Sequence, residues 1–392
     1  MTQKNFYRRR TLAARLTKLI TQVAVGGAAA SGVFLTAPRR TGKSTFARED
    51  LRPALEEAGA IVLYVDLWKD LTTEPGAVIV ETLREAIGRD EKLMSRLALA
   101  SGLESKSVGR VNFKLNKIGL GEEIGLTKAF EALSDEAKKL IVLILDETQH
   151  AITTAEGVAA LFALKAARDE LNSSKHYGLR IVCIGSNQNK LAMLRNSSDE
   201  AFFGASMLQL PMLDEDFVDW YCKALDLPNN LDPSDVFQLF QESGYRPQIL
   251  SAAADGIRFD LTVDPKAILV RFAELVRAQA EALNANLKMV IHSLTPIQSA
   301  VICVMGAKGE GFAPFESSTM ELYAKAIANA GIATNEPKVE APDVPDVPDV
   351  QLTLMALQEK KLVWKTSRGI YTIEEQVIVD LLREDGLLDD LV

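Results

Sequence analysis

Short apolar runs alternate with amphipathic segments through the first half of the chain. Runs of this kind, bounded by polar residues or glycine, predict buried β-strands. They cover residues 32–35, 60–68, 140–145, 180–185 and 206–211. The segments between them, such as residues 76–90, carry apolar residues at helical spacing. Strands that alternate with helices indicate an α/β fold, with a parallel sheet covered by helices.

Two segments depart from this alternation. Residues 7–25 predict a basic amphipathic helix, because their apolar residues recur at helical spacing. The segment imitates a secretory signal, but Arg15 and Lys18 interrupt its apolar part, so we interpret it as part of the folded protein. Residues 100–126 are weakly patterned and predict an insertion, in which the alternation over 111–115 is typical of a small hairpin.

The rest of the chain has predominantly helical periodicity. Residues 213–285 predict a helical region, in which Asp232-Pro233 and Asp264-Pro265 mark helix starts. From residue 286 the order of predicted elements is that of a winged helix, with three helices, a hairpin and a closing helix. They cover residues 295–305, 317–328, 350–359, 362–373 and 374–382. Between the second and third helices, residues 336–350 repeat Pro-Asp-Val, a composition that predicts an extended acidic loop.

Composition narrows the class of protein. The chain of 392 residues is long enough for two or three domains, and its 47% hydrophobic and 25% charged residues are typical of a globular protein with a sizeable core. A net charge of −9 argues against a general nucleic-acid coat protein but leaves a local basic patch open. Three distant cysteines form neither a disulfide framework nor a zinc motif, which favours a reducing, cytoplasmic location. No stretch approaches the ~20 apolar residues of a membrane span, so no membrane association is expected.

The first predicted strand runs into a glycine-containing loop that has the pattern of a phosphate-binding loop. The residues that we assign to nucleotide binding are Ala37, Pro38, Arg39, Arg40, Thr41, Gly42, Lys43, Ser44 and Thr45. Backbone N–H groups of such a loop wrap phosphates, and the helix that begins near Thr45 points its positive end at them. Lys43 would reach the β- and γ-phosphates, and Ser44 would ligate Mg²⁺. Because Ala37 stands where the stricter pattern has glycine, we expect a negative φ there.

A second set of polar residues follows two later strands. Asp146 and Glu147 come directly after the apolar run 140–145, at the end of a strand where α/β sheets place their ligands. Asp146 would hold Mg²⁺ through water, and Glu147 would orient and polarise the attacking water. The strand 180–185 ends in Ser186-Asn187, and a polar side chain at that tip could contact the γ-phosphate or the water. The alternative for the acidic pair is a plain strand end followed by a helix cap.

Together, these motifs resemble the AAA+ superfamily. The sequences APRRTGKST, LIVLILDETQH and CIGSN are most similar to archaeal-type and STAND-like ATPases, in which they are Walker A, Walker B and sensor 1. The resemblance covers roughly residues 5–260 and implies that Lys43, Ser44, Asp146 and Glu147 act as in that family, with Asn187 or Ser186 as sensor 1. It also implies that the helical region 213–285 is a lid that closes over the nucleotide.

Two arginine roles of that family have imperfect matches here. Many relatives carry an arginine after the Phe-Gly that precedes the last strand, but here Ala205 follows Phe203-Gly204. The resemblance therefore makes Arg195 the fallback for an arginine finger, with a solvated helix arginine as the alternative. Arg246, in the segment Gly-Tyr-Arg-Pro, matches the position of sensor 2, and the alternative for it is a charge near a helix start.

These expectations combine into one architecture. The fold class is α/β: a P-loop NTPase αβα parallel sheet, followed by a helical lid and a winged-helix domain. We predict a P-loop ATPase domain with its N-terminal basic amphipathic helix at residues 1–212, the helical lid at 213–285, and the winged-helix domain with its acidic loop at 286–392. The ligands implied are ATP and Mg²⁺.

Four functions compete for this architecture. The first is an ATP-hydrolysing molecular switch that couples nucleotide state to homo-oligomerisation and to engagement of a protein partner. The second is an ATP-dependent DNA-binding initiator, loader or mobile-element regulator that uses the winged helix. Few basic residues in the third predicted helix and the acidic loop before it favour the first over the second. Glu147 argues against a non-hydrolysing scaffold, and the additional C-terminal domain argues against a small-molecule kinase.

Overall fold

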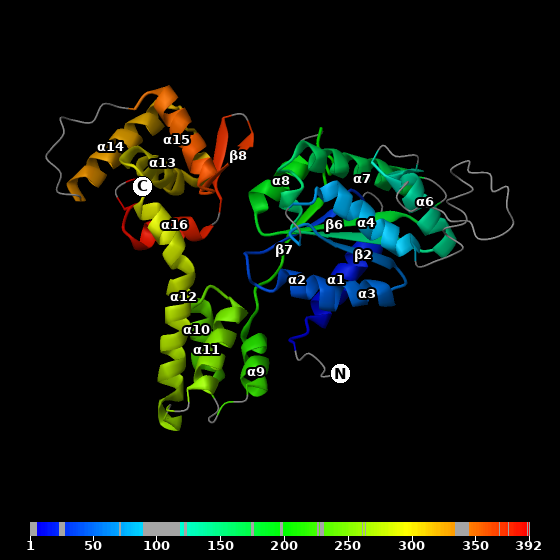
Figure 1. Ribbon diagram of the computed structural model, residues 1–392, viewed down its shortest axis with the longest axis horizontal. Helices are drawn as coiled ribbons and strands as arrows, with labels where there is room; N and C mark the ends of the chain where they lie inside the picture. The colour runs from blue at the N-terminus through cyan, green and yellow to red at the C-terminus, as the bar shows by residue number, and fades with distance from the viewer. Residues whose placement is uncertain are drawn as a thin grey trace. The chain divides into compact units, whose positions relative to one another are not determined.

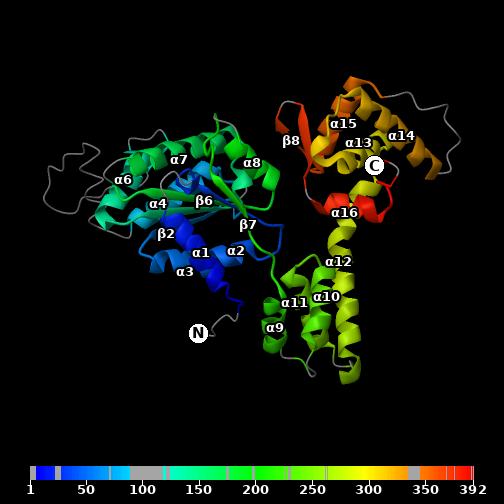
Figure 2. The same cartoon turned by 180° about the vertical axis from the view of Figure 1, so that it is seen from behind.

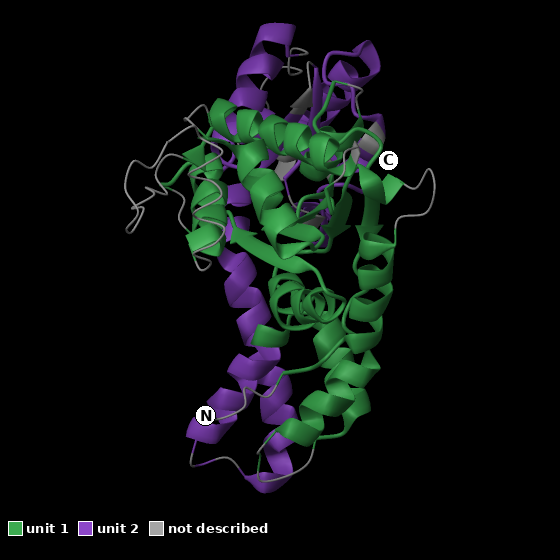
Figure 3. Cartoon of the chain, turned by 90° about the vertical axis from the view of Figure 1, so that its right-hand side faces the viewer, with its two compact units in different colours: residues 1–248 green, residues 249–392 purple. Residues whose placement is uncertain are grey.

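The computed structural model describes most of the chain. The residues outside the description are 1–5, 23–27, 70–71, 89–117, 121–123, 174–175, 197–198, 226, 228–230, 261, 263, 334–344, 368, 375, 390 and 392. The chain forms two compact units, residues 1–248 and 249–392, which are coloured separately in Figure 3. The division into three domains at residues 212 and 285 stays a prediction.

A five-stranded parallel sheet is the centre of the first unit. Its strands lie in the order β2-β5-β6-β1-β7 and all four pairings are parallel. Their bounds are Val33–Thr36 for β1, Ile61–Asp66 for β2, Ile141–Asp146 for β5, Leu179–Gly185 for β6 and Ser206–Gln209 for β7. The apolar runs therefore predicted every strand of this sheet, because buried parallel strands are apolar on both faces.

Helices cover both faces of the sheet (Figures 1 and 2). Successive side chains of a strand point to opposite faces, so each strand contributes to two cores. On β5, Val142 and Ile144 pack with helix α1 (Arg10–Thr21) and the helical segment after the loop. Leu143 and Leu145 pack on the other face with helices α4 (Pro75–Gly88), α6 (Leu126–Ala137), α7 (Ala155–Ser173) and α8 (Gln188–Asn196). The predicted αβα architecture is confirmed.

The helices of the first unit include the two that were predicted by range, at residues 7–25 and 76–90. Their bounds are Arg10–Thr21 for α1, Lys43–Phe46 for α2, Arg52–Glu57 for α3, Pro75–Gly88 for α4, Leu126–Ala137 for α6, Ala155–Ser173 for α7, Gln188–Asn196 for α8, Glu215–Ala224 for α9 and Pro233–Glu242 for α10, with short η1 (Ala28–Ala30) and η4 (Thr148–His150). The helix after the glycine loop begins at Lys43, two residues earlier than predicted, because Gly42 already terminates the loop.

A π-helical turn, η2 (Ala47–Leu51), joins α2 to α3. Pro53 explains its position, because proline has no N–H to donate to the carbonyl of Glu49. The guanidinium of Arg8 donates to that carbonyl instead. The backbone N–H of Arg9 also donates to the buried carboxylate of Asp50, over 3.1 Å. The basic N-terminal segment is thus bound to the helical segment that follows the loop.

Most of the predicted insertion lies outside the described residues, including the alternating stretch 111–115. The described part pairs β3 (Ile118–Gly119) with β4 (Ile124–Gly125) in parallel. Ile118, Ile124 and Leu126 join the core around α4 and α6.

The second unit is helical and ends in an antiparallel hairpin. Its elements are α11 (Pro247–Phe259, beginning at the unit boundary), η5 (Pro265–Ala267), α12 (Ile268–His292), α13 (Pro296–Lys308), η6 (Gly309–Gly311), α14 (Ser317–Ala333), α15 (Val347–Glu359), β8 (Val363–Ser367), β9 (Ile370–Ile373) and α16 (Gln376–Glu384). From α13 to α16, the order of helices and hairpin is the one predicted from residue 286 onward. Helix α12 continues across residue 285, where a domain boundary was predicted.

One part of the predicted acidic loop is helical instead. Helix α15 begins at Val347, three residues before the predicted start. Asp346 caps it by accepting a hydrogen bond from the N–H of Asp349 over 2.8 Å, and Pro348 lies in the first turn, where its missing N–H is no loss. The last Pro-Asp-Val repeat is therefore a helix start, while residues 334–344 lie outside the description.

No helix in the described part of the chain is long and apolar enough to cross a membrane. Cys183, Cys222 and Cys303 are free thiols, as their spacing predicts. Burial raises the pKa of the Cys183 thiol to about 12, so this residue is a core side chain and not a reactive one.

Candidate active site

The loop after β1 takes two left-handed backbone conformations to reach the start of α2. Gly42 has φ 86° and Arg40 has φ 64°. At Gly42 an added Cβ would meet only Leu213 Cδ1 at 3.9 Å, so glycine is required for its conformation more than for space. Ala37 is not among the described residues with positive φ, which confirms the expectation for that position.

The side chain of Lys43 lies within this loop. Its residue is only 5% exposed, and Nζ donates to the carbonyl of Pro38 over 2.9 Å. The hydroxyl of Thr41 donates to the same carbonyl over 2.8 Å. Ser44 is half-buried in the first turn of α2, whereas Thr45 is exposed. A buried ammonium at the N-terminal end of a long helical segment is an arrangement that suits a polyphosphate.

The acidic pair stands at the end of β5, as predicted. Asp146 is completely buried. Its Oδ1 accepts from the N–H of Glu147 over 3.0 Å, and its Oδ2 accepts from the hydroxyl of Tyr64. Glu147 has φ 55°, a left-handed conformation that is uncommon for a residue with a side chain. Strained backbone of this kind concentrates at functional sites.

Tyr64, Arg48 and Asp66 form a polar group beside Asp146. Strand β2 pairs with β5 in register, so that Asp66 stands opposite Asp146. Arg48 donates from Nε to the hydroxyl of Tyr64 over 3.0 Å and from NH2 to Asp66 over 2.9 Å. Burial, together with the neighbouring charge of Asp146, raises the pKa of the Tyr64 phenol, which therefore keeps its proton and donates it.

Ser186, at the tip of β6, connects the glycine loop to the acidic pair. Its Oγ accepts from Arg39 Nε over 3.4 Å and from Gln149 Nε2 over 3.3 Å. The same amide nitrogen of Gln149 donates to the carboxylate of Glu147. Arg39 also lies over the ring of Trp68, 5.0 Å from its centroid. Side chains from the ends of β1, β5 and β6 thus form one continuous polar cluster, as expected for one edge of a parallel sheet.

The other predicted residues have local contacts of their own. Asn187 caps α8, since its Oδ1 accepts from the N–H of Lys190 over 2.9 Å. Arg195, at the end of α8, donates from Nε to the carbonyl of Ala205, next to β7. Arg246 directly precedes α11, and its backbone N–H contacts Ser243 Oγ at 3.5 Å. None of these contacts assigns a catalytic role.

Sequence reasoning missed Tyr64, Arg48, Asp66 and Gln149. Tyr64 and Asp66 are polar residues inside an apolar strand. This interruption of the apolar pattern could have marked them as candidate site residues. Arg48 follows the glycine loop and Gln149 follows the acidic pair. Arg48 reaches the site because it lies in the π-helical turn η2, and Gln149 because it lies in the short 3₁₀ turn η4. No periodicity predicts those turns.

The donor set of this edge fits a magnesium nucleotide. Lys43 and the loop supply positive charge and N–H groups, and the buried carboxylate of Asp146 supplies oxygen donors, which Mg²⁺ prefers. Both carboxylate oxygens of Asp146 already accept hydrogen bonds, so a metal-bound water would have to compete with Tyr64 or share its oxygen.

Comparison with solved structures finds proteins of the same fold. A Walker-type ATPase of Pyrococcus abyssi matches with a TM-score of 0.53 at 15% identity, over 97% of both chains. The ORC2 protein of Aeropyrum pernix, in its ADP form, matches with a TM-score of 0.57 at 15% identity, over 100% of this chain and 96% of the other. No protein-family model matches the sequence, and no curated protein matches it. The chain therefore has the same fold as these two archaeal proteins.

Proposed function

We propose that the protein binds and hydrolyses ATP with Mg²⁺ and acts as a molecular switch. Nucleotide state would control self-association and the engagement of a protein partner. The observation that carries the ATPase part is the hydrogen-bonded connection from Arg39 through Ser186 and Gln149 to Glu147. It joins a phosphate-type loop to a carboxylate that can act on water. The ADP form of the ORC2 protein, which shares the fold, supports nucleotide as the ligand.

Each residue has a distinct task in this proposal. Lys43 and the N–H groups of residues 37–45 bind the phosphates, and Arg39 and Arg40 add positive charge at the loop. Ser44 and Asp146 hold Mg²⁺, which supplies charge stabilisation of the phosphate oxygens when it is bound. Glu147 orients the attacking water and accepts its proton. Ser186 is the better candidate for sensing the γ-phosphate, because its hydroxyl accepts from both Arg39 and Gln149, whereas the side chain of Asn187 caps α8.

The switch part rests on the helices that follow the sheet. Aromatic contacts tie α9 to the N-terminal segment, with Tyr7 5.6 Å from Phe217 and 5.7 Å from Trp220 between ring centroids. Arg9, in the same segment, donates to the carbonyl of Pro211 over 2.7 Å. A change at the helical segment after the loop could thus reach the proposed lid through Arg8 and Arg9. Arg246 is the candidate for sensor 2, whereas the contact of Arg195 with the carbonyl of Ala205 favours a structural role for that arginine over a finger. We propose a cytoplasmic location, which the free cysteines favour.

Matched variants of the two motifs test the ATPase proposal. Lys43→Ala should abolish ATP binding measured by calorimetry, because no other side chain supplies that point charge. Glu147→Gln should bind Mg²⁺–ATP normally yet lower turnover by ~10²-fold or more. ATP-trapped Glu147→Gln protein should also self-associate, measured by light scattering. Wild-type turnover in Glu147→Gln, or wild-type affinity in Lys43→Ala, would refute the assigned roles.

An ATP-dependent DNA-binding initiator remains the second candidate. The observation in its favour is a small basic group, Lys360, Lys361 and Lys365, exposed where α15 meets the hairpin. The apolar residues exposed on α15, Leu352 and Met355, favour a protein partner instead, and the affinity for duplex DNA separates the two candidates.

A further inference from the structure

A second group of chemically competent side chains lies away from the loop and the acidic pair. It consists of Glu131 on α6, Glu170 on α7 and His176 just before β6. Helix α6 leads into the N-terminal end of β5, and the segment with His176 leads into that of β6. Because these strands are parallel, their N-terminal ends lie at the edge of the sheet opposite to Asp146 and Ser186.

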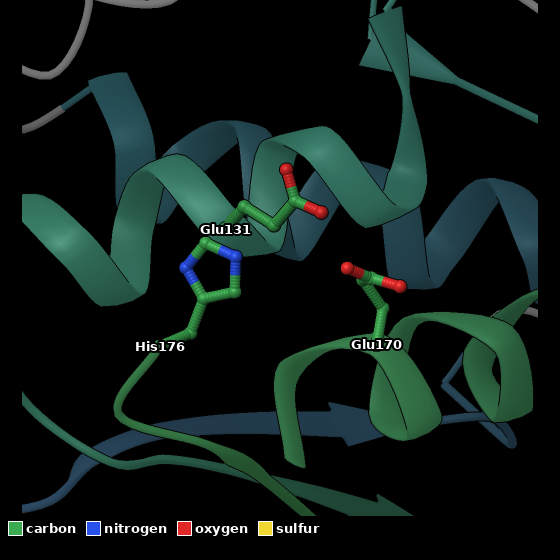
Figure 4. Close-up of side chains that lie close together, drawn as sticks. All are labelled: Glu131, Glu170 and His176. Carbon is green, nitrogen blue, oxygen red and sulfur yellow. The ribbon is translucent and has the colours of Figure 1, made fainter. Parts of the chain in front are cut away.

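The three side chains converge on one point. One ligand atom from each lies within 4.8 Å of the others, and among the described residues this is the one such group of histidine, cysteine and carboxylate side chains. In Figure 4 the imidazole ring lies to the left of the two carboxylates, and the carboxylate of Glu170 points toward the space between the three side chains. Glu131 and His176 are half-buried and Glu170 is exposed, so an ion could enter from solvent.

Asp135 fixes the orientation of the histidine. Its Oδ1 lies 2.7 Å from His176 Nδ1. With Nδ1 engaged in this way, Nε2 is the ring nitrogen that faces Glu131 and Glu170 (Figure 4). Asp135 follows Glu131 by four residues, so both carboxylates project from one face of α6. A carboxylate on the far nitrogen is the usual outer partner of a metal-binding histidine, because it sets the tautomer and makes the imidazole a better ligand.

The backbone that follows His176 is held by two sets of hydrogen bonds. The N–H of Tyr177 donates over 3.2 Å to Oγ of Ser134, which is completely buried in α6. The side-chain amide of Asn172 bonds both polar groups of Leu179, with 2.9 Å from its nitrogen to the carbonyl and 3.0 Å from its oxygen to the N–H. The histidine is therefore positioned by packing and hydrogen bonds that do not depend on the two glutamates, which is what a pre-organised site requires.

We propose that Glu131, Glu170 and His176 bind a divalent first-row transition-metal ion. One imidazole nitrogen and two carboxylate oxygens form a mixed donor set that suits Zn²⁺ and its neighbours better than Mg²⁺ or Ca²⁺, which prefer oxygen alone. Water would complete the coordination. A dication also offsets the negative charge of three neighbouring carboxylates, Glu131, Asp135 and Glu170.

Metal binding requires a small closure of the group. Donor atoms around tetrahedral Zn²⁺ lie about 3.3 Å apart, as follows from bond lengths of about 2.0–2.1 Å. Rotation of the flexible glutamate side chains closes the difference from 4.8 Å while the pinned histidine stays in place. The bound ion would join α6, α7 and the segment before β6 and so would stabilise the supports of the two strands that carry Asp146 and Ser186.

Calorimetry on the metal-free full-length chain tests this proposal without nucleotide. Titration with ZnCl₂ should show one site per chain, and CoCl₂ should give the visible absorption of a nitrogen- and oxygen-coordinated ion. His176→Ala should lose the site. Asp135→Asn should weaken Zn²⁺ binding by about 10–100-fold, as expected of an outer partner. Zn²⁺ should raise the thermal midpoint of the wild type and not that of His176→Ala.

His292 supplies the matched control. It also pairs with a carboxylate, 2.9 Å from Nε2 to Asp385 Oδ2, but it has no further ligands among the described residues. His292→Ala should bind Zn²⁺ like the wild type. Glu170→Gln, at an exposed position, guards against misfolding of His176→Ala and should weaken binding at least tenfold. Wild-type affinity in Glu170→Gln, absence of a stoichiometric site in the wild type, or equal loss in His292→Ala would each overturn the proposal.

Discussion

Gln149 donates its side-chain amide to the carboxylate of Glu147, the residue two positions before it. Glu147 has a left-handed backbone conformation directly after β5, and Gln149 lies in the 3₁₀ turn that follows. The amide nitrogen also contacts Ser186, which fixes it against the tip of β6. Gln149 is therefore placed to hold the proposed water-activating carboxylate in one orientation.

Removal of this amide should impair turnover and spare binding. We expect Gln149→Ala to lower kcat by ~10-fold or more at unchanged ATP affinity, because a misplaced base loses much of its contribution. Steady-state kinetics and calorimetry on the same preparation provide the comparison. An unchanged kcat would mean that Glu147 is oriented by other groups once nucleotide is bound.

Gly185 allows an independent perturbation of the same contact. A Cβ at this position would lie 2.2 Å from Gln149 Oε1, so Gly185→Ala must displace the amide. We expect Gly185→Ala to reduce kcat as Gln149→Ala does, and the double variant to show no further loss, since both changes remove one interaction. Gly125→Ala is the matched control, because an added Cβ there would have nothing within 4 Å. Gly204→Ala is less suitable because Gly204 has a φ of 72°, which strains any other residue. Additive losses in the double variant would show that Gly185 acts by another route.

The sequence specified the sheet far better than the site. Strands β5 and β6 are apolar except for Asp146 and Arg180, because both of their faces are covered, and a run of apolar residues indicates this directly. Glycine and proline positions likewise predicted the loop and several helix starts, such as the cap at Asp232. The contacts among Arg39, Gln149 and Ser186 could not be predicted, because they join three strand ends through side-chain orientations. The start of α15 was missed for a similar reason. The repeated Pro-Asp-Val sequence predicted a loop, but the last repeat is helical because Asp346 caps the helix with one hydrogen bond.

Tyr64 should contribute to stability through its hydrogen bond to the buried Asp146. Tyr64→Phe leaves one carboxylate oxygen without that donor, so we expect the free energy of unfolding to fall by about 1.5–3 kcal/mol in urea denaturation. The raised pKa of the phenol adds a pH signature. The stabilisation that the raised pKa of Tyr64 adds to the folded state is complete below the ordinary pKa of 10.0. It falls as pH rises above 10.0, because the phenol of the unfolded chain then releases its proton while that of the folded chain keeps it. Tyr177→Phe, at an exposed tyrosine, should change stability by less than about 0.5 kcal/mol. Equal effects of both variants would contradict the assigned contact.

A structural and a catalytic role of Arg195 predict different effects of its substitution. Its guanidinium donates to the carbonyl of the buried Ala205, and its own carbonyl accepts from the N–H of Gly204. We therefore expect Arg195→Ala to destabilise the chain by about 1–3 kcal/mol, because a buried carbonyl loses its donor. Any lost turnover should not return on mixing with Lys43→Ala. Restored turnover in the mixture would instead establish Arg195 as an arginine finger acting between subunits.

The exposed face of α15 decides between a protein partner and DNA. Leu352 is 65% exposed and Met355 is 53% exposed on this helix, and Asp349 lies in its first turn. A duplex-binding helix normally presents several lysine or arginine side chains to the phosphates. Here the basic group is confined to Lys360, Lys361 and Lys365, beyond the end of the helix or in β8. This surface is suited to an apolar partner surface and poorly suited to a polyanion.

We therefore expect the full-length chain to bind duplex DNA no more tightly than the non-specific range of about 10⁻⁴–10⁻⁶ M at physiological salt, by fluorescence anisotropy. The acidic segment before α15 could mask a DNA site, so the measurement should be repeated after deletion of residues 338–344. That deletion spares Asp346, whose loss would remove the cap of α15 and confuse the result. Lys361→Glu serves as the charge control and should change nothing if DNA is not a ligand. Sub-micromolar binding that weakens steeply with salt and is lost in Lys361→Glu would favour the initiator. Tight binding only after the deletion would make the acidic segment a regulator of a DNA site, because its charge opposes phosphate until it is moved away.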